Sequence, residues 1–163
     1  KSPRVVARDP AAVEEVLLEM GLKTAAKAIV EIAVAINEHF DGRVPDESLA
    51  LRSLPGVGDY LAEAVLCFGF GRRAVPVDAT TTRICTRVRG HNDDRRVQLR
   101  LDLYDLAGAP GPDAAFNRAL MDLGEEICRP SVKRCDICPL AELCSSAKST
   151  PDDEVELVKA VVS

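Results

Sequence analysis

The chain has 163 residues, of which 47% are hydrophobic and 29% charged, with 21 Lys and Arg against 26 Asp and Glu and a net charge of −5. This composition is typical of a globular protein with one domain or two small ones. The acidic total excludes a uniformly basic nucleic-acid coat, and aromatic residues at 4% with no Trp disfavour a base-stacking platform. With no apparent membrane span or signal peptide, we expect a cytoplasmic protein without structural disulfides.

The hydrophobic periodicity is helical along almost the whole chain. It predicts helices over residues 10–20, 25–40, 59–70, 79–88, 95–106 and 113–127, and a short helix that carries Leu49 and Leu51 with Asp46 as its N-cap. On the second of these helices, Ile29, Ile32, Ala33 and Ile36 form the expected buried face. Only residues 74–77 resemble a strand, and four residues are too few to build a sheet. The predicted fold class is all-α.

Positive charge is concentrated between Arg72 and Arg100, where eight Arg and three Asp give a local excess of +5. Arg83 and Arg87 share one helix face because they are four residues apart. This pattern fits either a solvated helix face or part of a DNA-binding face. The tail from residue 151 onward carries four acids and one Lys, so it is not expected to bind phosphate.

Four cysteines lie within seventeen residues with the spacing C-x6-C-x2-C-x5-C, namely Cys128, Cys135, Cys138 and Cys144. Four thiolates so close together can surround one metal centre, and an all-cysteine set suits either zinc or a [4Fe–4S] cluster. Structural zinc sites more often have two short-spaced pairs, so the single CxxC favours iron–sulfur. Cys67 and Cys85 lie among apolar residues and are expected to be core cysteines.

The interval between the first two of these cysteines holds three cations and no acid: Arg129, Lys133 and Arg134. A loop fixed at both ends by a metal centre could present these cations to phosphate. A merely solvated loop is the alternative.

A glycine hairpin, Leu54-Pro55-Gly56-Val57-Gly58, separates two amphipathic helices. Glycines before a helix N-terminus let backbone N–H groups point at an anion, which the helix dipole also attracts. On its own, a G-x-G of this kind is usually only a turn.

Taken in order, this hairpin, Val77-Asp78-Ala79, the stretch 116–124 and the four cysteines resemble the helix-hairpin-helix DNA glycosylases of the endonuclease III superfamily. The resemblance runs from about residue 10 to Cys144. It implies that the cysteines bind [4Fe–4S] and that double-stranded DNA with a mismatched or damaged base is the partner of a monomer. The implied domains are a helical barrel over 10–107 with the hairpin motif at about 46–70, a cluster domain over 108–146 and an acidic tail over 147–163.

The resemblance assigns DNA contacts to the hairpin residues Leu54, Gly56, Val57 and Gly58, and the catalytic carboxylate to Asp78. Such a carboxylate would stabilise the oxocarbenium-like transition state of N-glycosidic bond cleavage. An Asp two residues before Thr80 is also a good helix N-cap, and the two roles can coexist. The chain begins at Lys1 without Met, so we expect an upstream segment; the first helices of the family, which in some branches carry a second carboxylate, are absent here.

Tyr60 occupies the position at which the bifunctional branch of the family has a lysine. A phenol cannot form a Schiff base, so the expected enzyme is monofunctional. A Tyr here is similar to the mismatch-specific thymine/uracil glycosylases, in which it borders the base pocket; packing on the barrel is the alternative.

Thymine or uracil opposite guanine is therefore the first substrate expected. Residues 116–124 also resemble adenine glycosylases acting on mispaired A, although only nineteen residues follow Cys144, too few for the C-terminal domain usual in that branch. An endonuclease III-like oxidised-pyrimidine glycosylase and a non-catalytic iron–sulfur DNA-binding protein remain as further alternatives.

Overall fold

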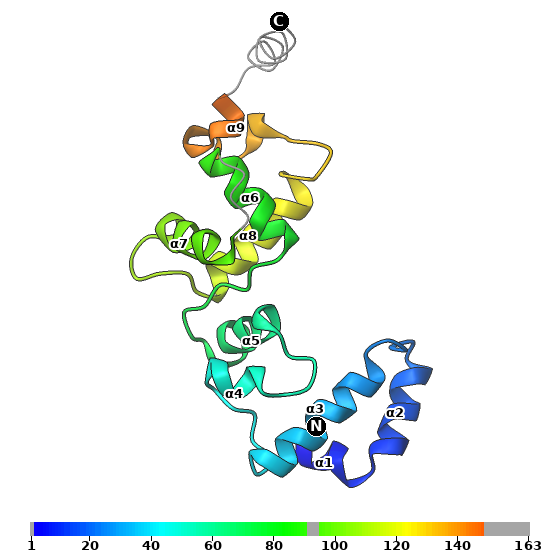
Figure 1. Ribbon diagram of the computed structural model, residues 1–163. Coiled ribbons are helices and arrows are strands. Elements are labelled where there is room, and N and C mark those ends of the chain that lie inside the picture. The colour runs from blue at the N-terminus through cyan, green and yellow to red at the C-terminus, as the bar shows by residue number, and fades with distance from the viewer. Residues whose placement is uncertain (1, 91–94, 149–163) are drawn as a thin grey trace, which may run out of the picture. The chain divides into compact units, whose positions relative to one another are not determined.

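A computed structural model of the protein describes residues 2–90 and 95–148, and Figure 1 shows its arrangement. Within these residues the regular elements are helical, apart from one antiparallel bridge between Cys128 and Lys133. The all-α prediction is confirmed. Most of the predicted acidic tail, from residue 149 on, lies outside the described residues. No helix among the described residues combines the length and apolarity needed to cross a membrane.

Contacts within the chain divide it into two compact units, Lys1–Arg72 and Arg73–Ser163. The hairpin lies in the first unit, and Asp78 and the four-cysteine segment lie in the second. The domain boundaries expected from the family resemblance stay a prediction.

The first unit begins with three helices, α1 (Pro3–Arg8), α2 (Pro10–Glu19) and α3 (Ala26–His39), of which α1 and α2 both pack against α3 (Figure 1). The predictions of α2 and α3 are confirmed. Helix α1 was not predicted, because six residues show no full hydrophobic period. It begins with Pro at its first position, and Arg4 Nε donates to the Asp41 carbonyl over 3.2 Å, which ties α1 to the end of α3.

The buried face of α3 consists of Ala26, Val30, Ala33 and Ile36. The prediction that Ile29 lies on this face was wrong, since its side chain is 39% exposed. The observed stripe runs from Ala26 through Val30 and Ala33 to Ile36, so Val30 takes the place expected for Ile29; both choices satisfy helical periodicity, and packing against α1 and α2 decides between them.

Two short helices flank the glycine hairpin, α4 (Ser48–Arg52) and α5 (Asp59–Ala64), and α5 continues into a π-helical turn, η1 (Val65–Gly69). The predicted N-cap Asp46 was wrong: Glu47 holds that position without a side-chain cap, and Asp46 instead pairs with Arg72 over 2.7 Å. Whether Asp46 caps the helix or pairs with an arginine depends on where Arg72 lies in space, and the local sequence does not show this. The predicted helix over 59–70 is otherwise confirmed.

The second unit is built on α6 (Ala79–Arg89), α7 (Arg96–Ala107) and α8 (Ala114–Glu126), and α6 packs against both of the others. After α8 come two 3-10 turns, η2 (Cys135–Ile137) and η3 (Ala141–Leu143), and a last short helix, α9 (Ser145–Lys148). The apolar core of this unit includes Val75, Val77, Ile84, Val88, Leu99, Leu103, Leu120 and Leu123.

Cys67 and Cys85 are both buried, at 0% and 1% exposure, as predicted for core cysteines. Burial raises the pKa of the Cys85 thiol to about 11, and the Asp102 carboxylate acts in the same direction, while Arg89 opposes them. A raised pKa keeps the thiol protonated near neutral pH, which fits the role of a core cysteine.

Candidate functional site

The hairpin between α4 and α5 is anchored by its apolar side chains. Leu54 and Val57 are only 5% and 8% exposed, and Val57 N–H donates to the Leu54 carbonyl over 3.2 Å. Gly56 has φ of +71°, a left-handed conformation that glycine adopts without strain. Gly58 is extended and opens α5 with no side-chain cap. The side chains of the hairpin are thus used in packing, and its backbone is the part that can face a ligand.

An ion pair that the sequence pattern did not reveal crosses this hairpin. Arg52 Nη1, at the end of α4, lies 2.7 Å from Asp59 Oδ1, in the first turn of α5. The pair fixes the two helices relative to each other, and it places one acid beside the backbone groups that were predicted to meet an anion. Tyr60 follows Asp59 on α5, and its side chain is 40% exposed.

Asp78 is the N-cap of α6 and forms a capping box with Thr81. Its Oδ1 accepts from the Thr81 N–H over 2.8 Å and from the Thr81 hydroxyl over 2.9 Å. The Asp78 N–H lies 2.9 Å from the Thr81 hydroxyl oxygen, which closes the box. The capping role predicted for Asp78 is confirmed; its catalytic role stays a prediction.

The second carboxylate oxygen of Asp78 accepts no hydrogen bond among the described residues, and the residue is only half-buried. Thr81, by contrast, is 2% exposed and cannot turn away. The carboxylate is therefore held in one orientation through one oxygen, while the other oxygen remains able to face a bound molecule.

The four cysteines of the C-x6-C-x2-C-x5-C pattern line one pocket, together with residues that include Arg87, Ile127, Lys133 and Ala147. All four are free thiols. Cys144 is buried, and Cys128, Cys135 and Cys138 are half-buried. The structure thus brings together the predicted ligand set, although no group of three or more His, Cys, Asp or Glu in the described part of the chain is arranged to hold a metal ion.

Two arginines of α6 hold the segment that begins this cysteine pattern. Arg83 Nε donates to the Cys128 carbonyl over 3.0 Å, and Arg87 Nη1 and Nη2 donate to the carbonyls of Arg129 and Pro130 over 2.7 and 2.9 Å. Arg87 Nη1 also lies 3.2 Å from Cys128 Sγ.

For Arg83 and Arg87, these contacts contradict one of the two alternatives that the sequence left open, a solvated helix face. Both are half-buried, and their guanidinium groups are spent on backbone carbonyls of the cysteine segment. Their four-residue spacing indicated a shared face, but nothing local in the sequence shows that the partner is a loop about 41 residues away.

The three cations predicted to meet phosphate, Arg129, Lys133 and Arg134, are all exposed. Arg129 Nε donates to the Glu125 carbonyl over 2.6 Å, so this side chain is partly held against the end of α8. The Cys128–Lys133 bridge and the Arg134 N–H, which donates to the Ile127 carbonyl over 3.1 Å, close the loop that carries the three cations. They therefore project from a closed loop with a defined path, not from an open connection.

No protein-family model matches the chain. Among curated proteins, it is 35% identical over 131 residues to the thymine/uracil-DNA glycosylase of Methanothermobacter thermautotrophicus, a match that covers 78% of the chain and 59% of that protein. It is 36% identical over 138 residues to the adenine DNA glycosylase of Mycolicibacterium smegmatis, covering 83% of the chain and 47% of that protein. The chain thus spans about half to three fifths of the length of these curated relatives.

Among solved structures, a thermostable thymine-DNA glycosylase superposes with a TM-score of 0.78 at 31% identity, covering 90% of the chain and 70% of that structure. Endonuclease III in a non-covalent complex with DNA superposes with a TM-score of 0.73 at 24% identity, which shows the shared fold. The similarity in sequence and in fold points to the same family as the hairpin, Asp78 and the four cysteines did. The chain belongs to the helix-hairpin-helix DNA glycosylases of the endonuclease III superfamily.

Proposed function

We propose that this protein is a base-excision-repair DNA glycosylase, which flips a mispaired base out of double-stranded DNA and hydrolyses its N-glycosidic bond. The observation that carries the proposal is Asp78. Its carboxylate is fixed by a capping box through one oxygen, while the other oxygen is without a partner among the described residues. Relatives at 35% and 36% identity are themselves DNA glycosylases by name.

The chemistry needs a fixed negative charge beside the sugar. As the glycosidic bond breaks, the sugar approaches an oxocarbenium ion, and a carboxylate that is already oriented stabilises the developing positive charge without reorganising. Water then attacks the sugar carbon. In this account, the Thr81 bonds hold Asp78 Oδ1 in place, and Oδ2 faces the sugar.

Thymine or uracil opposite guanine is the proposed substrate. Tyr60, 40% exposed on α5, offers an aromatic face and a hydroxyl to border a flipped pyrimidine. The thymine/uracil-DNA glycosylase at 35% identity and the thermostable thymine-DNA glycosylase at TM-score 0.78 support this choice. Because a phenol cannot form an imine with the sugar, the enzyme acts without lyase chemistry.

Excision of adenine mispaired with guanine or 8-oxoguanine is the second candidate. An adenine DNA glycosylase is 36% identical over 138 residues, a longer match than that to the thymine/uracil enzyme. The two candidates predict different released bases, so one assay separates them.

A [4Fe–4S] cluster is proposed as the resident cofactor of the four-cysteine pocket. The donor set is all sulfur, the four thiols line one pocket, and the single CxxC spacing favours an iron–sulfur cluster over a zinc site. Cys128, Cys135, Cys138 and Cys144 would hold it. When bound, the cluster would act structurally, by joining the ends of the cation-bearing loop to α9.

Duplex DNA is the proposed partner of a monomeric enzyme acting in the cytoplasm, where the nucleoid lies. The hairpin backbone at Gly56–Gly58 and the exposed cations Arg129, Lys133 and Arg134 are the proposed phosphate contacts. These contacts are few and local, so they are compatible with a net charge of −5.

A panel of end-labelled duplexes tests the proposal, each with one lesion: G·T, G·U, A·G, A·8-oxoguanine or thymine glycol, with an undamaged duplex as control. We expect free thymine or uracil to be released under single-turnover conditions, with a strand that breaks only after alkali. Release of adenine would favour the second candidate. Binding to all duplexes without release of any base would leave a non-catalytic DNA-binding protein and overturn the proposal.

A further inference from the structure

One face of α8 lies against the chain on both sides of Asp78. Before Asp78, the extended segment 74–77 is buried at every position but belongs to no sheet. Asn117, 1% exposed on α8, donates from Nδ2 to the Ala74 carbonyl over 2.9 Å and to the Asp113 carbonyl over 2.8 Å. A single side-chain amide thus joins the approach to Asp78 to the first turn of α8.

Two helical turns further along α8, Gly124 lies against the chain that follows Asp78. A Cβ at Gly124 would meet Thr80 Cγ2 at 2.2 Å and Ile84 Cδ1 at 3.3 Å. The absence of a side chain therefore lets the first turn of α6 approach α8 closely. Arg83 Nη2 donates to the Gly124 carbonyl over 3.1 Å and holds the two helices at this spacing.

Asn117 and Gly124 are seven residues apart, so they lie on the same face of α8, with buried Leu120 between them. Burying an amide is unfavourable unless it is hydrogen-bonded, and an apolar residue would fill this core position at lower cost. The Asn117 amide donates one of its two hydrogen bonds to a carbonyl four residues before Asp78 and the other to the Asp113 carbonyl. Asn117 therefore fixes the position of the backbone at Ala74, in addition to filling space in the core.

We propose that Asn117 is a positioning residue for the Asp78 carboxylate, acting with Gly124 through the backbone on either side of it. This inference rests on the proposed glycosylase function. The capping box fixes Asp78 relative to α6, whereas Asn117 fixes the incoming chain relative to α8. Displacing a reacting group by about 1 Å can lower a rate by as much as 100-fold, so losing the anchor should slow base release.

The test compares Asn117→Leu, which removes the amide donor but keeps a side chain branched at the same carbon, with Asp113→Ala. Asp113 caps α8, its side chain accepting from the Phe116 N–H over 2.9 Å, so its removal destabilises the same helix without touching Ala74. We expect the single-turnover rate to fall 10- to 100-fold in Asn117→Leu, with the Kd for the duplex within twofold of wild type. In Asp113→Ala the melting temperature should fall, but the rate should not.

A double-mutant cycle shows whether Asn117 acts through Asp78. In an Asp78→Asn background, Asn117→Leu should lower the rate no further, because the group that it positions is gone. Equal rate losses in both backgrounds would overturn the inference, as would a normal rate in Asn117→Leu. If the leucine variant does not fold, Asn117→Ala repeats both measurements.

Hydrogen exchange gives a readout besides activity. The Thr81 amide, bonded to Asp78 Oδ1, should exchange faster in Asn117→Leu and at the wild-type rate in Asp113→Ala. Unchanged exchange in Asn117→Leu would overturn the inference even in an active glycosylase. A wild-type protein that excises no base from any duplex would overturn the proposed function, and the rate measurements would then have no meaning. The exchange measurement would still report on the positioning role of Asn117, so the two failures are distinguishable.

Discussion

Tyr60 bears directly on whether the enzyme cuts the DNA strand. Strand cleavage by a glycosylase needs an amine that attacks the sugar carbon, and the sequence holds no lysine between Lys27 and Lys133. The Tyr60 side chain, 40% exposed, stands in the second position of α5, directly after the residue that pairs with Arg52.

We therefore predict no covalent adduct when the wild-type protein and a cleavable duplex are mixed with borohydride, because no imine forms. Tyr60→Lys should introduce some trapping, and Tyr60→Phe, the matched control, should introduce none. Gel electrophoresis of the labelled strand measures the adduct. Efficient trapping by the unmodified protein would show that another amine serves, and the monofunctional assignment would then be wrong.

The cysteine segment, from Cys128 to α9, depends on α6 as much as on its own residues. Arg83 and Arg87 hold the carbonyls of its first loop, and the Cys144 thiol lies 3.4 Å from the Arg87 carbonyl, within reach for donation. The spacing of the cysteines predicted their meeting, and the structure brings them to one pocket. The arginine contacts were not predictable, since they join elements more than 40 residues apart.

At the scale of this element, Cys138→Ser should abolish the brown colour and the iron content, which we expect at about four atoms per chain in the wild type. The reason is that three thiolates cannot complete a four-cysteine ligand set. Cys67 is a buried cysteine of the first unit, so Cys67→Ser is the matched control, and that variant protein should keep its full iron content. Iron analysis and visible absorption measure both. A colourless wild-type protein with one zinc would contradict the cluster assignment.

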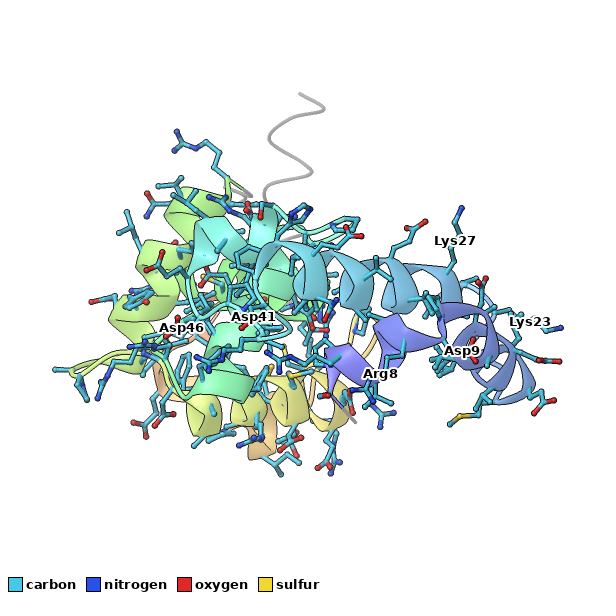
Figure 2. The ribbon with its side chains drawn as sticks, turned by 90° about the horizontal axis from the view of Figure 1, so that it is seen from below. Arg8, Asp9, Lys23, Lys27, Asp41 and Asp46 are labelled. Carbon is cyan, nitrogen blue, oxygen red and sulfur yellow. The ribbon has the colours of Figure 1, made fainter. Side chains whose placement is uncertain are left out.

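The cation-bearing loop should dominate the salt dependence of DNA binding. Reversing Lys133 and Arg134 together to Glu should weaken binding to matched and mismatched duplexes alike, on the order of tenfold or more at low salt, and flatten the salt dependence. Arg8 and Lys23 are exposed cations in the first unit, labelled in Figure 2, and their double reversal is a control with the same change of charge. Equal effects of both pairs would mean that net charge alone acts.

The helices were largely predictable because the long ones carry an apolar stripe and a local signal where they start or stop. Helices α3, α6 and α8 show this, with Gly90 in the left-handed conformation after α6 and Asp113 capping α8. Helix α1 escaped because its stability comes from packing on α3 and from the Arg4 contact with Asp41, not from its own six residues. Asp46 was wrongly predicted as an N-cap for a similar reason, because its partner Arg72 lies 26 residues further along the chain.

At the scale of the whole molecule, the candidate functional residues are divided between the two compact units. The hairpin and Tyr60 belong to the first unit, and Asp78, Asn117 and the cysteine pocket belong to the second. The hairpin, Tyr60, Asp78 and the four cysteines became candidates because their order and spacing resemble a known family, and not because any one of these short motifs is specific by itself. What holds them in place could not be read from the sequence, since Asn117 and Gly124 act through backbone contacts with distant segments.

The central claim is that Asp78 is the catalytic carboxylate and not only a helix cap, and the single-turnover rate of Asp78→Asn tests it most directly. Asn caps a helix about as well as Asp, so melting temperature and DNA affinity should stay near wild type. Without the negative charge, the rate of base release should fall on the order of 10²–10⁴-fold, or about 3–5 kcal/mol. An Asp78→Asn variant that releases the base at close to the wild-type rate would leave Asp78 as a cap alone and contradict the account.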